Sequence, residues 1–499
     1  MKKEIVLNFV FTALAGIVMF LQNKYFVQYM GLEILGIMKL FTQLLQYLNI
    51  VEMGLESASA FALYKPLAEK NYKQVSVILS TIKSTYNKIA ILLFILGIFI
   101  TPLLPFFMKV KIFNKMIYLY WILYVLNTVS TYLFIKYVIL FTANQEFLFT
   151  RIVKSLSMVF YQILQIFLIV KYQSFILCII LLLLDNLTQY ILLKKHFNKN
   201  YSFVYQTKDK YNGINKDIKN LFWHKIGGLI VFNTDFILIS KLISLEVVGI
   251  YANYQLIIQM IRTLINVVVN IIKPKIGKYI ALNSKENIYQ LFRKINIIFL
   301  MIGLIFSFCS YILINNFINL WIGIEYILPK FTVQLICINI FIVLFRVILD
   351  IFKDGSGFFD DIQCPILESI INLVFSIILG IKYGLNGIIM GTIISNISII
   401  LIYKPILTFK KCFNQNLKEY IKVYGNYVLL IIISLLSLNK IIKIFIVNEI
   451  NNCLDWILYS IKISIFISII LSVIFLLNKD FRNVLKEIYY NFFKGVKND

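Results

Sequence analysis

Two charged residues in the second half of the chain lie in stretches that are otherwise apolar. Asp235 interrupts the run from Phe222 to Tyr254, and Arg262 interrupts the apolar run that follows it. Polar residues accompany them, namely Asn233, Asn253 and Gln259. Arginine presents a planar, permanently charged fork that matches a phosphate or a carboxylate. These residues predict either a cavity wall that contacts an anion or a buried Asp235–Arg262 ion pair, and both can hold at once.

Three further charges lie in an apolar stretch of the first half, near residues 34–62. Lys39 is close to one end of it, while Glu52 and Glu56 are four residues apart and share one helix face. A charge inside a membrane-spanning helix needs a partner or a water-filled cavity. Lys39 therefore either meets an anionic head group or extends toward water from the helix end. Glu52, Glu56 and Asp235 are candidates for coupling transport to an ion, although a structural role, capping a break near Gly54 or pairing with inner-loop lysines, is favoured for the two glutamates.

Metal, redox and nucleotide chemistry find no support in the sequence. The six cysteines lie far apart without a Cys-x-x-Cys pair, which favours apolar fillers. Neither His196 nor His224 has a carboxylate or cysteine at ligand spacing. Gly355-Ser356-Gly357 lacks the Gly-Lys-Ser/Thr of a phosphate loop and reads as a break between helices. We expect no metal, no cofactor and no enzymatic activity.

The elements that position these residues are membrane helices. Of the 499 residues 60% are hydrophobic, and the mean hydropathy is +0.83, whereas soluble domains are roughly 45–50% apolar. The apolar runs are too long for the ~10-residue strands of a barrel. The sequence therefore predicts an all-α polytopic membrane protein with about fourteen transmembrane helices, the first of them an uncleaved N-terminal span. The expected spans lie near residues 5–23, 34–62, 89–108, 116–140, 152–170, 174–193, 221–240, 247–272, 295–314, 331–350, 364–381, 386–408, 423–440 and 455–477.

The formal net charge of +25 has a topological explanation. If the N-terminus lies in the cytoplasm, most lysines and arginines fall in inward-facing segments, as the positive-inside rule requires. Both termini are then cytoplasmic, and the basic face matches anionic membrane lipids. No basic segment carries a recognisable nucleic-acid-binding motif, so we expect no nucleic acid as a partner.

The chain repeats itself. Leu32–Ile37 (LEILGI) recurs as Leu245–Ile250 (LEVVGI), Lys65-Pro66 as Lys273-Pro274, and Lys171-Tyr172 as Lys382-Tyr383. Because the repeated unit contains an even number of spans, both copies have the same orientation, and duplicated membrane units often build transporters. We expect two six-helix lobes related as a parallel repeat, followed by two accessory C-terminal helices. The expected boundaries are 1–195 for the first lobe, 196–220 for a cytoplasmic linker, 221–408 for the second lobe, and 409–499 for the accessory pair and tail.

Two groups of residues point to packing rather than to a site. Gly384, Gly387 and Gly391 are spaced so that two helices can approach closely. Structural roles are also expected for charged residues that lie nearer the ends of their spans, namely Asp185, Arg346, Asp350 and Glu368.

Five segments together resemble a known family in their order and spacing. They are Leu35–Ala68, with Glu52-Met53-Gly54-Leu55 and Tyr64-Lys65-Pro66 inside it, His224–Asp235, Val248–Tyr254, Pro365–Glu368 and Gly384–Thr392. Over about residues 5 to 430 the chain is similar to the Wzx-type polysaccharide (O-antigen) flippases. These belong to the multidrug/oligosaccharidyl-lipid/polysaccharide (MOP) exporter superfamily.

The resemblance implies a function in polysaccharide biosynthesis at the bacterial cell (inner) membrane. Such a flippase moves undecaprenyl-pyrophosphate-linked oligosaccharide between leaflets for O-antigen, capsule or exopolysaccharide assembly. The partners it implies are that lipid-linked oligosaccharide, membrane lipids, a polysaccharide polymerase and a chain-length regulator. Related lipid flippases place arginines in the first span, and here that span has no cation before Lys24. Lys39 and Arg262 are therefore inferred from this sequence and not transferred from the family.

Three other functions compete with this one. A cation-coupled multidrug exporter of the same fold would use an ionisable group deep in one lobe, for which Asp235 qualifies. A membrane glycosyltransferase or an O-antigen polymerase would need sizeable outer loops, whereas the longest expected here is 315–330. A membrane scaffold would not require spans interrupted by polar residues.

Overall fold

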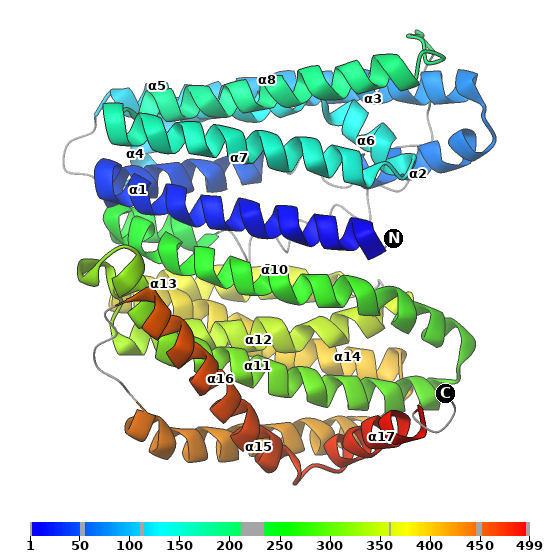
Figure 1. The fold of residues 1–499 in the computed structure, drawn as a ribbon, viewed down its shortest axis with the longest axis vertical. Coiled ribbons are helices and arrows are strands. Elements are labelled where there is room, and N and C mark those ends of the chain that lie inside the picture. The colour runs from blue at the N-terminus through cyan, green and yellow to red at the C-terminus, as the bar shows by residue number, and fades with distance from the viewer. Residues whose placement is uncertain are drawn as a thin grey trace. The chain divides into compact units, whose positions relative to one another are not determined.

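The computed structural model describes residues 2–49, 55–109, 114–209, 211, 234–358, 361–445 and 452–495, whose regular elements are helices (Figure 1). The chain divides into two compact units, Met1–Ala252 and Asn253–Asp499. The first contains α1 (Lys2–Leu48), α2 (Leu55–Ala68), α3 (Tyr72–Ile100), the 3₁₀ turn η2 (Thr101–Leu103), α4 (Leu104–Phe107), α5 (Met116–Thr131), α6 (Ile135–Ala143), α7 (Phe147–Tyr172) and α8 (Phe175–Asn200). α10 (Leu245–Leu282) begins in the first unit and continues in the second. The second unit then contains α11 (Lys285–Trp321), the 3₁₀ turn η4 (Ile324–Tyr326), α12 (Lys330–Gly355), α13 (Gln363–Ser395), the π-helical turn η5 (Asn396–Tyr403), α14 (Lys404–Lys411), α15 (Leu417–Phe445), α16 (Cys453–Phe475) and α17 (Lys479–Gly495).

The apolar helices have the length that a membrane requires. Nine helices of the described part are long and apolar enough to cross it, or ten if the bent α10 is counted as one span. One of the nine, Gln363–Lys411, contains two of the fourteen expected spans. α1 contains the first expected span and the beginning of the second, 34–62, whose last part lies in α2, and most of the seventh lies outside the described residues. The prediction of an all-α, polytopic membrane protein is confirmed.

Each copy of the repeated motif begins directly after a turn. α1 turns at Gly31, where φ is 84° and ψ is 167°. Glycine tolerates such a positive φ because it has no Cβ atom. In the second copy, helical residues 234–242 end before Ser244, and α10 starts at Leu245. The repeated Leu-Glu pair therefore opens a helix in both copies.

The two copies of the motif pack against each other through their glycines. A Cβ atom built on Gly36 would lie 2.0 Å from the carbonyl oxygen of Leu245, and one built on Gly249 would lie 2.4 Å from the carbonyl oxygen of Leu32. Leu245 is the counterpart of Leu32, and Gly249 is the counterpart of Gly36. A contact that is reciprocal in this way is the kind that a local two-fold axis produces.

The Lys-Tyr repeat also has a structural counterpart. α7 ends at Tyr172 and is followed by Gln173 with φ 48°, while Tyr383 is followed by Gly384 with φ 58° inside α13. In both copies the lysine ammonium lies 5.2 Å from the ring centroid of the tyrosine beside it. The repeat thus preserves the turn and the contact before it.

The glycines that follow Gly384 allow the two halves of α13 to approach closely. A Cβ atom on Gly387 would lie 1.9 Å from the Leu379 carbonyl oxygen, and one on Gly391 would lie 2.4 Å from the Ser376 amide nitrogen. The Ser376 hydroxyl donates a hydrogen bond to the Ile388 carbonyl at 3.1 Å. The predicted role of these glycines in helix packing is confirmed.

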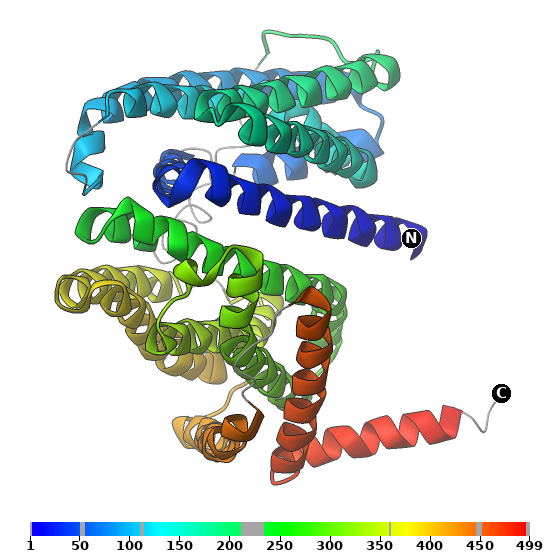
Figure 2. The ribbon, with the colours of Figure 1, turned by 60° about the vertical axis from the view of Figure 1, so that its left-hand side comes forward.

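The C-terminal helices pack on the second unit. α16 contacts α11 and α15, and α17 contacts α11. Figure 2 shows α17 leaving the end of α16 and extending away from α15. Beneath α15, the rings of four phenylalanines pack together with centroids 4.7–6.1 Å apart, namely Phe292, Phe352, Phe409 and Phe413.

Candidate functional site

Polar side chains of the first unit gather around Asp235. The buried Thr234 hydroxyl shares a hydrogen bond of 2.8 Å with the hydroxyl of Tyr47, which comes from the second half of α1. The Tyr251 hydroxyl, near the beginning of α10, donates to the Asp235 carboxylate at 3.4 Å. The second half of α1, residues 234–235 and the beginning of α10 thus meet here, and Asp235 is partly buried among them. A carboxylate can accept hydrogen bonds from a sugar or hold a cation.

The other predicted site residues of this unit do not join the group around Asp235. Lys39 is partly buried on α1, about two helical turns before Tyr47. Glu56 is exposed in the first turn of α2. Glu52 and Asn233 lie outside the described residues. The structure therefore joins Asp235 to neighbours that the sequence did not indicate, Tyr47 and Tyr251.

The remaining predicted contacts lie on α10 in the second unit. Asn253 is buried with 1% of its surface exposed, Gln259 is exposed, and Arg262 is partly buried. Gln259 and Arg262 are three residues apart and therefore share one helix face. Asp235 and Arg262 belong to different units, so the ion pair between them stays a prediction.

A network of buried charges joins α12, α13 and α14 in the second unit. Arg346 donates to Asp350 at 3.2 Å and to Glu368 at 3.3 Å, and Lys404 donates to Asp350. Glu368 is 4% exposed, so the partners must neutralise one another. The pairing agrees with the structural role expected for Arg346, Asp350 and Glu368.

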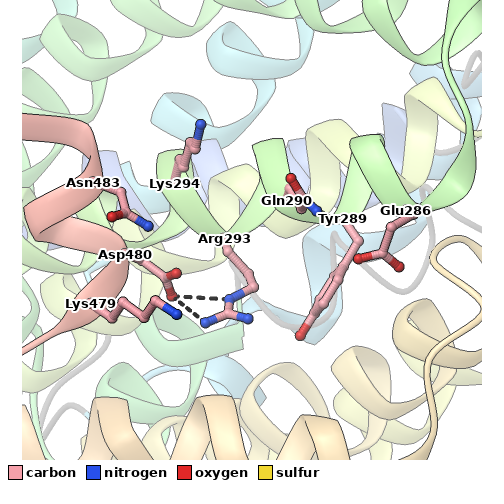
Figure 3. A pocket seen from close by; sticks show the side chains of 8 residues that line it. All are labelled: Glu286, Tyr289, Gln290, Arg293, Lys294, Lys479, Asp480 and Asn483. Atoms are coloured by element: carbon pink, nitrogen blue, oxygen red, sulfur yellow. Dashed lines mark hydrogen bonds and ion pairs between the residues drawn. The ribbon is translucent and has the colours of Figure 1, made fainter. Parts of the chain in front are cut away.

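A cavity of about 290 Å³ lies between α11 and α17 (Figure 3). Arg293 points at Asp480 and donates to it from Nε at 3.0 Å and from Nη2 at 2.8 Å. Arg293 also lies 3.6 Å from Glu419 of α15, and Lys294 pairs with Glu487 of α17. Because Arg293 and Lys294, two of the three cations that line it, face carboxylates, this cavity fastens α15 and α17 to α11 and is a poor site for an added anion.

No group of three metal-ligating side chains occurs among the residues that the structure describes. His196 does have an acidic neighbour that the sequence did not reveal. Its Nε2 lies 2.8 Å from a carboxylate oxygen of Glu146, which also accepts hydrogen bonds from Tyr201 and Asn144. The two residues are 50 positions apart, so sequence spacing could not join them.

Comparison with known proteins identifies the fold. No protein-family model matches the chain, and no curated protein does. The structure of the lipid II flippase MurJ in an inward closed conformation is similar, with a TM-score of 0.66 and 18% identity, over 94% of this chain and 98% of that one.

Two MATE transporter structures are similar as well. An inward-facing multidrug resistance MATE family transporter of the MOP superfamily gives a TM-score of 0.60 and 11% identity over 79% of this chain and 96% of that one. A mutant of the Vibrio cholerae MATE transporter VcmN gives a TM-score of 0.56 and 14% identity over 83% of this chain and 98% of that one. At these identities the likeness establishes the fold, which is the one that these membrane transporters share.

Proposed function

We propose that the chain is a flippase of the MOP type for lipid-linked oligosaccharides. It moves undecaprenyl-pyrophosphate-linked repeat units from the inner to the outer leaflet of the bacterial cell membrane by alternating access, with both termini in the cytoplasm. The observation that carries the proposal is the likeness in fold to MurJ, itself named a lipid II flippase, over 94% of the chain. The segments that resemble Wzx-type flippases extend it to O-antigen, capsule or exopolysaccharide assembly.

The chemistry of this substrate explains the need for such a protein. A sugar pyrophosphate does not cross ~30 Å of hydrocarbon unaided. It requires a hydrated cavity with a few fixed cations, while its lipid tail remains between helices. A transporter of two lobes supplies the cavity without breaking the seal of the membrane.

We assign the head-group contacts to both halves of the repeat. Lys39 and Arg262 are the cations for the pyrophosphate, and Asn253 and Gln259 are donors and acceptors for sugar hydroxyls, together with Asn233. Asp235 lies among the hydroxyls of Tyr47, Thr234 and Tyr251 and accepts hydrogen bonds from the substrate or takes part in coupling.

A cation-coupled multidrug exporter is the second candidate. The likeness to two MATE transporters and the partly buried carboxylate of Asp235 favour it. In that case Asp235 would couple transport to a cation, with Glu52 and Glu56 as further coupling candidates.

Deletion of the gene separates the two candidates. For the flippase, lipid-linked repeat units accumulate on the inner leaflet, fewer of them reach the polymerase and the chain-length regulator, and less surface polysaccharide is made. Inner-leaflet and outer-leaflet pools are measured by accessibility of the sugar to a lectin in inverted and right-side-out vesicles. Unchanged surface polysaccharide with increased sensitivity to cationic drugs would instead establish the exporter.

A further inference from the structure

A second cavity, of about 230 Å³, opens at the end of the first unit that is expected to face the cytoplasm. α3 contributes Ser80 and Lys83 to its wall, and α6 contributes Lys136 and Tyr137. The rest of the wall consists of Leu79, Phe197, Asn198, Val204, Tyr205 and Gln206. The lining therefore contains two ammonium groups, three hydroxyls, two amides and aromatic rings, and it contains no carboxylate.

Positive charge is concentrated at this cavity. The charged side chains that act on Lys136 are Lys83 and Lys194, and both repel it. The Lys136 ammonium lies 4.6 Å from the ring centroid of Tyr137 and 5.8 Å from that of Phe197. Aromatic faces hold a cation without neutralising it. Among the described residues none of the three lysines forms an ion pair with a carboxylate.

The cavity between α11 and α17 provides the contrast. There Arg293 meets Asp480 and Glu419, and Lys294 meets Glu487. Like charges gathered without a counter-charge oppose folding, so two lysines in one cavity wall, with Lys194 acting on one of them, indicate an anion supplied from outside the chain.

The wall of the cavity is held in place before any ligand arrives. Residues 203–209 and 211 lie along α3, and three hydroxyls of that helix accept hydrogen bonds from their backbone amides. These bonds join Tyr205 to Ser76 at 3.2 Å, Thr207 to Ser80 at 3.1 Å and Tyr211 to Thr81 at 3.0 Å. Lys83 donates to the Gln206 amide oxygen at 3.3 Å. The cation is therefore positioned by a neutral acceptor that an anion can replace or share.

The three lysines lie at the depth of lipid head groups. Counted from the opposite end of its candidate span, Lys83 lies 24 residues before Phe107, Lys136 lies 20 residues after Met116, and Lys194 lies 19 residues after Phe175. A helix rises 1.5 Å per residue, so these intervals span ~29–36 Å, which is enough to cross the ~30 Å hydrocarbon core. Lysines at that distance from the opposite membrane surface meet the phosphates of the nearer leaflet.

We propose that Lys83 and Lys136 in the cavity wall, supported by the charge of Lys194 nearby, form a binding site for the phosphate group of an anionic lipid in the leaflet on the predicted cytoplasmic side. The aromatic rings of Tyr137 and Phe197 position the ammonium of Lys136, and the Ser80 hydroxyl and Asn198 amide are available as donors to the phosphate oxygens. The site is independent of the transported substrate and adds an inner-leaflet lipid as a ligand of the first unit.

Native mass spectrometry of the full-length protein, with phosphatidylglycerol as the probe, tests the proposal. The variant Lys83→Gln/Lys136→Gln should bind phosphatidylglycerol at least fivefold more weakly than the wild type. The charge-matched control Lys73→Gln/Lys88→Gln changes two exposed lysines of α3 that do not line the cavity, and it should bind as the wild type does. Equal affinity of both variants would overturn the proposal.

Two further measurements separate misfolding and free phosphate from a lipid site. Without lipid, the cavity variant should melt at or above the wild-type temperature because it has lost like-charge repulsion, and added phosphatidylglycerol should raise the melting temperature of the wild type alone. Phosphatidylcholine, which carries no net charge, should have no such effect. If millimolar inorganic phosphate displaces the lipid and stabilises the wild type equally, the assignment to a lipid is wrong.

Discussion

Gly36 lies so close to Leu245 that a Cβ atom at position 36 would be 2.0 Å from the Leu245 carbonyl oxygen, and the counterpart pair, Gly249 and Leu32, repeats the contact at 2.4 Å. The obstacle in each case is backbone, which cannot rotate away as a side chain can. The helices that open the two copies of the repeat are therefore held at a separation that only glycine permits.

Substitution at either glycine should disturb this contact. Gly36→Ala and Gly249→Ala should each lower the free energy of unfolding by ~1–3 kcal/mol, since an added methyl group forces the backbones apart. Gly425→Ala on α15 is the control, because a Cβ atom there has nothing within 4 Å. It should be neutral or stabilising by ~0.5–1 kcal/mol. Thermal unfolding in detergent measures all three, and equal melting temperatures would contradict the prediction.

Arg262 should be required for its fork as well as for its charge. Arg262→Ala should reduce delivery of surface polysaccharide more than Arg262→Lys, because lysine keeps the charge but loses the paired donors. Complementation of the deletion strain gives the activity, and immunoblots of the membrane fraction give the protein level. Equal losses that follow a lower protein level would point to a structural ion pair instead.

The buried network of the second unit should be sensitive to loss of one partner. Glu368→Ala removes one of the carboxylates that pair with Arg346 inside the protein. It should lower the free energy of unfolding by ~3–5 kcal/mol. The exposed pair Lys65–Glu69 is a control, with its charged atoms 3.8 Å apart and its side chains 83% and 54% exposed. Glu69→Ala should change stability by less than ~1 kcal/mol. Chemical unfolding of the two variants compares a buried pair with an exposed one.

Glu146 should make stability depend on pH. Burial raises the pKa of this carboxyl, but hydrogen bonds from Tyr201, His196 and Asn144 outweigh burial and leave the pKa below its ordinary value of 4.5. A carboxyl whose pKa is depressed in the folded state stabilises the protein above its unfolded pKa, and this contribution disappears as the pH falls through the folded pKa.

Glu146→Gln should therefore destabilise the protein at pH 7 by ~1–3 kcal/mol, the scale of hydrogen bonds to a charged group. The difference from the wild type should shrink as the pH falls below 4.5. Melting temperatures of both proteins between pH 3 and pH 7 test this, and a constant difference over that range would show that Glu146 acts only through packing.

The sequence predicted the membrane helices and the places where the chain turns, because both depend on local patterns. Long apolar runs require helices in a bilayer, and Lys171-Tyr172 and Lys382-Tyr383 each precede a residue with positive φ. The close packing of Gly387 was predictable for the same reason, since small residues at helical spacing permit contact.

Contacts between distant side chains were not predictable in this way. Tyr47 meets Thr234 across 187 positions, and Arg293 meets Asp480 across the same interval. Neither pair leaves a periodic signal, because each depends on how helices are placed in three dimensions. The neighbours of Lys136 were not predictable for the same reason. In the sequence Lys136 is one isolated charge in an apolar run, and only in the folded structure do Lys83 and Lys194 lie close enough to act on it.

The reciprocal contact between the two Leu-Glu motifs also bears on what a single copy can do. A surface on which Leu32 meets a copy of Gly36, while Gly36 meets a copy of Leu32, is complementary to itself. A single copy of this motif would therefore already be able to pack against an identical copy of itself. The two copies in this chain keep that contact while the charges beside them differ, as the lysine at position 39 and the alanine at its counterpart, Ala252, illustrate.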